Sequence, residues 1–343
     1  MTDSLALCGA GLIAGAHAAA AQILHIPILA VASRTPARAA ELAQRAQSRP
    51  VPYAELPAGA SLVAVCTPPQ MHAADALRLL QSGAAVLVEK PLCTTLADAD
   101  LLVESAAAHQ QQLLYAENLA YAPAVSALLA QVGSLGIVNH LHVRTLQALP
   151  TWGNFTSDEW GGGALFDLGA HPLALAVLTA GACGAGPVRA VSAKLEGGAG
   201  HHSDEHAEVS LTFASGLVGH VVSSWKHQPG QQQWDLQVSS ETGVVRIDFW
   251  PEPTLERNGE SVRLPSPRTA VPFLEHLGYL NQLRAFAHDS STGSRPLMDA
   301  EFGRLILDIM CCAYQSAGRD GASESVPFSG DRTKTPLQLW HHS

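Results

Sequence analysis

Three residues of this 343-residue chain have the chemistry for moving a proton at a carbon–oxygen bond. Lys90 stands in the tripeptide EKP, and Asp167 and His171 are four residues apart after a run of three glycines. An imidazole titrates near neutral pH, so His171 can take a proton from a hydroxyl group or return it to a carbonyl. A lysine ammonium stabilises a developing alkoxide. Asp167 can orient the imidazole if the segment is helical, although Pro172 favours a break in the regular turns. We predict Lys90, Asp167 and His171 as catalytic residues.

A glycine-rich stretch near the start of the chain predicts a dinucleotide-binding turn. The sequence CGAGLIAGAH follows a short apolar run, and its Gly9, Gly11 and Ala14 fit the GxGxxG/A pattern of a strand–turn–helix unit. Gly9 permits the tight turn, and Gly11 lets the backbone approach a pyrophosphate. The free N–H groups at the start of the helix, at Leu12 and Ile13, would face that anion. The alternative is a glycine-rich turn that binds no ligand.

The end of the second expected strand indicates which dinucleotide is preferred. An acidic residue there would bind the 2′-hydroxyl of NAD, but the chain has Ser33, Arg34 and Arg38, with no carboxylate before Glu41. Guanidinium groups pair with phosphate through two parallel hydrogen bonds. We therefore predict a preference for NADP(H). NAD(H) is the alternative if both arginines are only solvated surface residues.

Loops at the carboxyl ends of parallel strands bind ligands in this class of fold, and they supply further candidates. Tryptophan can stack on a sugar or nicotinamide ring, and equally often it anchors packing. A histidine at the start of a helix, such as His72, can contact the cofactor, and alternatively it only caps the helix or packs against its neighbours. The predicted cofactor contacts are Gly9, Gly11, Leu12, Ile13, Ser33, Arg34, Arg38, Thr67, Pro68, His72, Glu89, Lys90 and Asn118. The predicted substrate contacts are Lys90, Tyr121, Trp152, Trp160, Asp167 and His171.

The elements that must position these residues follow from the apolar pattern. In the first third, short apolar runs alternate with alanine-rich segments, which is typical of a parallel sheet with crossover helices. Longer alternating runs follow, and HAEVSLTFASGLVGHVVSSW and WDLQVSSETGVVRIDFW each predict an antiparallel hairpin. We expect strands at 5–8, 28–33, 62–66, 85–88 and 112–115, and helices at 70–81, 96–109, 272–288 and 299–317, the last two completing the second domain.

The predicted fold class is α/β with two domains. Residues 1–118 form a Rossmann domain with a doubly wound parallel sheet. Residues 119–343 form an α+β domain with a large open-faced, mostly antiparallel sheet for substrate binding and oligomerisation.

Composition argues against several classes of partner. A net charge of −10 without a basic cluster argues against nucleic acid, because phosphate binding needs a basic surface. The first apolar stretch lacks a basic leader and is interrupted by glycines and His17, so neither a signal peptide nor a membrane span is expected. Six cysteines without CxxC spacing fit a reducing compartment, and we predict a cytoplasmic protein. The segment HHSDEH at 201–206 lacks the spacing of a zinc site, so no metal is predicted.

Four motifs occur in an order that resembles the Gfo/Idh/MocA family, named for glucose-fructose oxidoreductase, inositol dehydrogenase and a rhizopine-catabolism protein. They are GAGLIA, CTPPQMH, VEKPL and GGGALFDLGAH, and the similarity spans nearly the whole chain. The resemblance implies a nicotinamide-dependent oxidoreductase acting on sugars, cyclitols or related polyols, with its active site between the two domains. It also implies a homodimer or homotetramer and supports Lys90, Asp167 and His171 as site residues. Ala174 stands where many cyclitol-oxidising members have a second aspartate, which weakens any transfer of inositol specificity.

Two other functions use the same scaffold. A redox-assisted NAD-dependent glycosidase oxidises a sugar transiently to help cleave its glycosidic bond, and it releases sugar without a net change in cofactor absorbance. A non-catalytic dinucleotide-binding regulator binds cofactor and turns over no polyol. The set formed by Lys90, Asp167 and His171 argues against the regulator.

Overall fold

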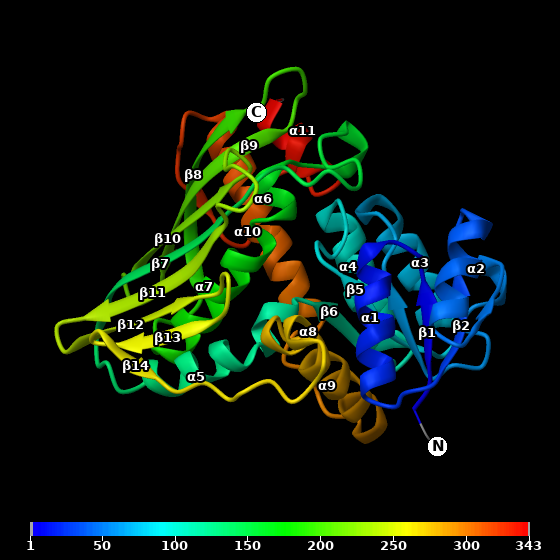
Figure 1. Ribbon diagram of the computed structural model, residues 1–343. Helices are drawn as coiled ribbons and strands as arrows, with labels where there is room; N and C mark the ends of the chain where they lie inside the picture. Colours follow the sequence, from blue (N-terminus) through cyan, green and yellow to red (C-terminus); the bar gives the residue numbers. More distant parts are fainter. Residues whose placement is uncertain (1–2, 342–343) are drawn as a thin grey trace. The chain divides into compact units, whose positions relative to one another are not determined.

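The computed structural model describes residues 3–341, which form two compact units (Figure 1). Unit 1 comprises Met1–Cys93, Ala97–Tyr121 and Pro267–Arg304. Unit 2 comprises Thr94–Leu96, Ala122–Ser266 and Leu305–Ser343. The chain therefore returns to unit 1 after it has formed the long strands of unit 2.

Within the described residues, unit 1 contains a six-stranded parallel sheet in the order β3-β2-β1-β4-β5-β6. Its strands are β1 (Leu5–Cys8), β2 (Ile28–Ala32), β3 (Arg49–Pro50), β4 (Leu62–Val65), β5 (Ala85–Glu89) and β6 (Leu113–Ala116). Every residue of β1, β4, β5 and β6 is buried. Strands covered on both faces contain uninterrupted apolar runs, which is why the sequence predicted them within a residue or so. The predicted Rossmann sheet is confirmed.

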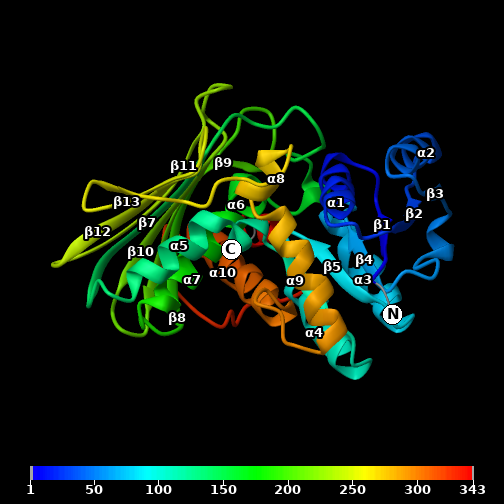
Figure 2. The same ribbon diagram turned by 60° about the horizontal axis from the view of Figure 1, so that its bottom comes forward.

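The helices of unit 1 connect these strands or return to pack beside them. They are α1 (Leu12–Ile23), α2 (Pro36–Arg45), α3 (Pro69–Gln81), α4 (Leu96–Ala108), α8 (Pro272–His276) and α9 (Tyr279–Thr292). The sequence predicted one helix at 272–288, but Gly278 with φ +84° separates α8 from α9. The sequence pattern also grouped this segment with the second sheet, whereas α9 packs on α1 and on the turn Asn118–Tyr121 in unit 1 (Figure 2).

Within the described part of unit 2, nine strands form one sheet in the order β14-β13-β12-β11-β7-β10-β9-β8-β15. They are β7 (Val138–Leu146), β8 (Val188–Gly197), β9 (Asp204–Phe213), β10 (Val218–Ser224), β11 (Gln233–Ser240), β12 (Gly243–Asp248), β13 (Thr254–Arg257), β14 (Glu260–Val262) and β15 (Glu324–Ser325). Strands β7 and β10 are parallel, and all other neighbours are antiparallel. Both predicted hairpins are present, as β9–β10 and β11–β12.

One face of this sheet is covered by helices, and the other carries polar side chains. Along β9, Ala207, Val209 and Leu211 are buried, whereas Glu208 on the opposite face is exposed. Helices α5, α6 and α7 pack on the sheet, and Figure 1 shows them on one side of it. The helices of unit 2 are α5 (Pro123–Val132), α6 (Ala164–Asp167), α7 (Ala170–Ala182), most of α10 (Ala300–Gly318) and α11 (Pro336–His341).

The apolar character of α7 reflects its position in the core of unit 2. Among the described residues, no single helix has the length and apolar composition of a membrane span. The segments Asp158–Asp167 and Ala170–Ala182, bent by 47°, meet these criteria only when taken together. Most residues of α7 are buried against β7 and β10.

Candidate active site

The glycine turn after β1 has the geometry that its sequence predicted. Gly9 has φ +120°, and a Cβ atom there would lie 2.6 Å from the carbonyl oxygen of Cys66. Gly11 has open space around it, since a Cβ added there would have no neighbour within 4 Å in the described part of the chain, and it begins α1 without a side-chain cap. The side chain of Leu12 is 63% exposed, whereas Ala14 is fully buried against the sheet. Gly9 is therefore required by the fold itself, and Gly11 leaves the N-terminus of α1 open to an anion.

The other predicted cofactor residues lie along the same edge of the sheet. Strands β2, β1, β4, β5 and β6 are parallel neighbours, so the residues that follow them share the carboxyl edge. Ser33 and Thr67 follow the two strands next to β1, whereas Lys90 and Asn118 follow β5 and β6, farther along the same edge. This edge is where ligands bind in doubly wound sheets.

The segment after β2 presents a hydroxyl group and two cations. The Ser33 hydroxyl accepts a hydrogen bond of 3.2 Å from the backbone N–H of Thr35. Arg34 and Arg38 are exposed. No acidic side chain occurs between Ser33 and Arg38, so the local charge after β2 is positive.

His72 is buried and holds two loops of unit 1 through its ring. Its Nδ1 lies 2.9 Å from the carbonyl oxygen of Pro91, and its Nε2 lies 2.6 Å from that of Thr67. Burial lowers the pKa of His72, although both carbonyls and the carboxylates of Glu89 and Asp75 oppose this. A neutral imidazole has one N–H and donates to one of the two carbonyls. The predicted contact of His72 with cofactor stays a prediction, and so does that of Thr67, whose hydroxyl donates to Asp75.

Lys90 directly follows β5 and is half-buried, and its peptide bond to Pro91 is cis. Asn118 and Tyr121 lie after β6 and are buried. The Asn118 amide donates to the carbonyl oxygen of Leu277 at 2.8 Å, and the Tyr121 hydroxyl accepts from the backbone N–H of Met298 at 3.4 Å. These polar groups hold the returning segment of unit 1, and their predicted contacts with ligands stay predictions.

Asp167 and His171 stand on either side of a helix break in unit 2. Asp167 ends α6, Gly169 precedes α7, and His171 is the second residue of α7. Pro172 then falls in the first helical turn, where its missing N–H leaves no hydrogen bond unmade. Both Asp167 and His171 are buried. The break that Pro172 predicted is confirmed, so the two side chains do not share one continuous helix.

The three glycines before α6 are explained by packing. A Cβ at Gly163 would lie 2.2 Å from the carbonyl oxygen of Asp204, and one at Gly162 would lie 2.3 Å from Cβ of Phe166. The buried Asp204 carboxylate accepts hydrogen bonds from the Tyr314 hydroxyl at 2.5 Å and from the backbone N–H of Leu165 at 2.8 Å. Burial raises the pKa of Asp204, and the hydrogen bonds from Tyr314 and the backbone oppose this. This network fixes the start of α6, and thereby the segment that carries Asp167.

An aromatic cluster lies beside this segment in unit 2. Phe155 packs against Trp160 and Trp225, with ring centroids 4.7 Å and 6.3 Å apart. Trp234 packs against the same cluster, and its ring centroid is 5.9 Å from that of His171. The indole nitrogens of Trp160, Trp225 and Trp234 are buried and have no hydrogen-bond partner among the described residues. Buried donors are normally paired, and these three N–H groups are exceptions within residues 3–341.

Most of the chain is similar to known oxidoreductases. The oxidoreductase family with an NAD-binding Rossmann fold, GFO/IDH/MocA, matches residues 4–117, and the GFO/IDH/MocA C-terminal domain matches residues 125–246. A dTDP-3,4-didehydro-2,6-dideoxy-alpha-D-glucose 3-reductase of Saccharopolyspora spinosa is 30% identical over 273 residues, covering 76% of this chain and 75% of the relative. The chain belongs to the Gfo/Idh/MocA family.

Two further proteins are similar to this Gfo/Idh/MocA oxidoreductase over most of its length, one in sequence and one in structure. The D-glucoside 3-dehydrogenase of Escherichia coli K12 is 26% identical over 280 residues, covering 75% of this chain and 77% of the relative. The crystal structure of GenD2 from gentamicin A biosynthesis, in complex with NAD, superposes with a TM-score of 0.83 and 25% identity, covering 94% of this chain and 96% of that one. The resemblance predicted from four motifs is therefore confirmed.

The sequence pattern of this Gfo/Idh/MocA chain did not indicate two members of the aromatic cluster. It singled out Trp160 and Trp152, of which Trp152 is 45% exposed and contacts Phe155. It missed Trp225, directly after β10, and Trp234, on β11. The signal for both was their position at the boundary of an alternating strand, but strand order was needed to bring Trp234 near His171 and Trp225 against Phe155.

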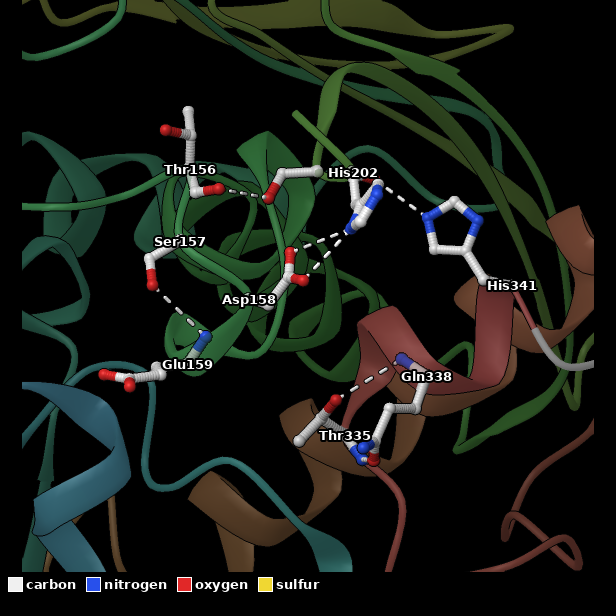
Figure 3. A network of polar contacts seen from close by, with 9 residues as sticks. Thr156, Ser157, Asp158, Glu159, His202, Thr335, Gln338 and His341 are labelled. Carbon is white, nitrogen blue, oxygen red and sulfur yellow. Dashed lines mark hydrogen bonds and ion pairs between the residues drawn. The ribbon is translucent and has the colours of Figure 1, made fainter. Parts of the chain in front are cut away.

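His201 and His202 of the histidine-rich segment pair with separate acidic groups. His202 contacts the carboxylate of Asp158 at 3.0 Å, and its carbonyl oxygen lies 2.8 Å from Nε2 of His341 in α11 (Figure 3). His201 instead contacts Glu205. Among residues 3–341, no group of three or more His, Cys, Asp or Glu side chains has the arrangement of a metal site. The segment ties α11 to the loop that carries Asp158.

Proposed function

We propose that this Gfo/Idh/MocA enzyme transfers a hydride between NADP(H) and carbon 3 of a glucose-type sugar. The observation that carries the choice of substrate is the aromatic cluster of Phe155, Trp160, Trp225 and Trp234 near His171, whose three indole N–H groups lack a partner within residues 3–341. A pyranose has apolar C–H faces that stack on aromatic rings and hydroxyl oxygens that accept hydrogen bonds. The cluster offers both kinds of contact.

The names of two relatives support carbon 3 as the reacting atom. One is named a D-glucoside 3-dehydrogenase and the other a 3-reductase of a dideoxyglucose nucleotide. Both names specify position 3 of a glucose-type ring. Our proposal extends that position to this chain.

The proposed mechanism assigns one task to each predicted catalytic side chain. The bound cofactor supplies or accepts hydride at its nicotinamide ring. The Lys90 ammonium stabilises the negative charge that develops on the reacting oxygen. The His171 imidazole takes the hydroxyl proton during oxidation and returns it during reduction. The Asp167 carboxylate orients and charge-balances that imidazole.

The residues after β2 support the choice of NADP(H). Arg34 and Arg38 are exposed, and no carboxylate stands near the sequence position that would bind the 2′-hydroxyl of NAD. The family is described by an NAD-binding Rossmann fold. Our choice of NADP(H) over NAD(H) therefore rests on Arg34 and Arg38.

We also propose that the chain forms a homodimer or homotetramer through the polar face of the nine-stranded sheet. That face has no helix over it among the described residues of unit 2, and its strands are long and alternating (Figure 1). Light scattering of the purified protein measures the assembly directly. A monomer across the working concentration range contradicts this part of the proposal.

The principal experiment measures hydride transfer from isotopically labelled glucosides. We expect oxidation of a methyl glucoside, followed by nicotinamide absorbance, with a primary kinetic isotope effect when deuterium is at carbon 3. Glucosides labelled at carbon 2 or carbon 4 are the matched controls and should show none. An isotope effect at another carbon contradicts the assigned position. Release of methanol without a net absorbance change would identify the redox-assisted glycosidase instead.

Substitutions test the catalytic residues and the aromatic cluster. Lys90→Ala and His171→Ala should each reduce turnover by about 10²-fold to 10⁴-fold with cofactor binding retained, and Lys334→Ala is the control for loss of an amine elsewhere. Trp234→Phe keeps an aromatic ring and removes the N–H, so KM for the sugar should rise by roughly 3-fold to 10-fold. Trp250→Phe, at a 45% exposed site, is its control. Full activity of both the Lys90 and His171 variants overturns the mechanism.

A further inference from the structure

The backbone at Lys90 is held on both sides by buried side chains of unit 1. The Lys90 N–H donates to Oε2 of Glu89 at 3.2 Å. The next carbonyl oxygen, that of Pro91, lies 2.9 Å from Nδ1 of His72. Glu89 and His72 are both buried. The Lys90 Cα therefore lies between two anchored backbone groups.

The Glu89 carboxylate is itself fixed by a histidine from a distant helix. Nε2 of His17, in α1, lies 2.7 Å from Oε1 of Glu89. His17 is fully buried, and its ring and that of Tyr279 in α9 meet edge to face, with centroids 5.7 Å apart and planes at 81°. Each carboxylate oxygen of Glu89 thus has a donor, His17 on one side and the Lys90 N–H on the other.

A role in stability alone does not explain this pair well. Taking a carboxylate out of water costs free energy, and an apolar pair of similar volume is often as stable or more stable. A buried pair that links a helix to the backbone of one residue restricts where that residue can move. For a group that must meet a reacting atom, a displacement of about 1 Å can cost 10²-fold in rate.

We propose that His17 is a positioning residue for Lys90, acting through the Glu89 carboxylate. The proposal rests on the proposed role of Lys90 in hydride transfer. His17 fixes the position of the Glu89 carboxylate, and that carboxylate accepts the hydrogen bond from the Lys90 N–H. The Lys90 side chain therefore extends from a backbone position that is held in place. On the other side of Lys90, the contact of His72 with the Pro91 carbonyl oxygen keeps the backbone of Pro91 from shifting.

The test compares His17→Leu, which removes the donor, with His17→Gln, whose amide N–H can still donate to Glu89. The chain has four lysines, Lys90, Lys194, Lys226 and Lys334. Acetylation of each amine in the full-length protein, read by peptide mass spectrometry, reports the environment of Lys90 with the other three as internal controls. Turnover, KM and the dissociation constant for NADPH are measured on the same preparations.

We expect the Lys90 labelling rate to change by at least about 3-fold in His17→Leu, while the other lysines label as in wild type. Turnover should fall by roughly 10-fold to 10²-fold with little change in NADPH affinity, and His17→Gln should restore both properties. Unchanged Lys90 labelling in His17→Leu overturns the proposal. Equal losses in the two variants also overturn it, because a merely structural role predicts them.

Glu89→Leu keeps the test available if His17→Leu does not fold. It removes both acceptor oxygens from His17 and from the Lys90 N–H, so Lys90 labelling should change; labelling at the wild-type rate overturns the proposal. Failure of the proposed function gives a different result. In that case Lys90→Ala retains turnover, while the labelling of Lys90 still reports whether His17 positions it.

Discussion

Substitutions at Gly9 and Gly11 in the glycine turn distinguish a glycine that folding requires from one that cofactor binding requires. At Gly9, φ of +120° disfavours any side chain, and a Cβ would approach the Cys66 carbonyl oxygen to 2.6 Å. Ordinary contact between such atoms needs 3.4 Å or more, so β1 and β4 must separate by several tenths of an ångström. Strained backbone costs about 1–3 kcal/mol and overpacking about 1–3 kcal/mol. Gly9→Ala should therefore lower the free energy of unfolding by roughly 2–6 kcal/mol.

Gly11→Ala is the matched control because it adds the same methyl group two residues away. No described atom lies within 4 Å of the place a Cβ would take, and the backbone is extended with φ −87° and ψ −170°. Its free energy of unfolding without cofactor should stay within about 1 kcal/mol of wild type. The methyl group would instead obstruct the pyrophosphate, so the dissociation constant for NADPH should rise by at least about 10-fold, or 1.4 kcal/mol.

Urea denaturation of the cofactor-free protein measures the first quantity, and fluorescence titration with NADPH measures the second. A Gly9→Ala protein within about 1 kcal/mol of wild type would show that the close approach to Cys66 does not restrict position 9. A Gly11→Ala protein that binds NADPH as wild type does would show that the turn is not the pyrophosphate site.

Three further perturbations follow from the contacts described. Tyr314→Phe leaves the buried Asp204 carboxylate without one donor and should lower the free energy of unfolding by about 1–3 kcal/mol in urea; an unchanged midpoint contradicts this. Arg34→Ala should raise the dissociation constant for NADPH by about 10-fold and leave that for NADH within about 3-fold; equal changes contradict the 2′-phosphate contact. Burial lowers the pKa of His72 from 6.5, so its contribution to folding is present above pH 6.5 and is lost as the pH falls through the lowered pKa. The unfolding free energy of His72→Gln should therefore fall less than that of wild type between pH 7 and about pH 5, and parallel curves would show that His72 is not responsible.

Much of unit 1 could be predicted because its signals are local. The apolar runs of β1, β4 and β5 are continuous since both faces of those strands are buried, and the glycine turn must follow β1 directly. The position of Lys90 after β5 then places it at the carboxyl edge of the sheet, where ligands bind in other doubly wound folds. Local patterning also predicted the hairpins β9–β10 and β11–β12, because their side chains alternate between a covered face and an open one.

Contacts between distant residues were decided only by the tertiary structure. His17 meets Glu89 across 72 residues of chain, and Asp204 meets Tyr314 across 110. A histidine or an aspartate is as plausible on the surface as in a buried pair. The residues next to His17 or Asp204 in the sequence do not indicate which distant residue each one contacts. Trp234 lies near His171 because of the order and register of the strands, and α9 packs on α1 because the chain returns to unit 1. A short-range pattern fixes which residues are buried, whereas the pairing of buried groups depends on how whole elements dock.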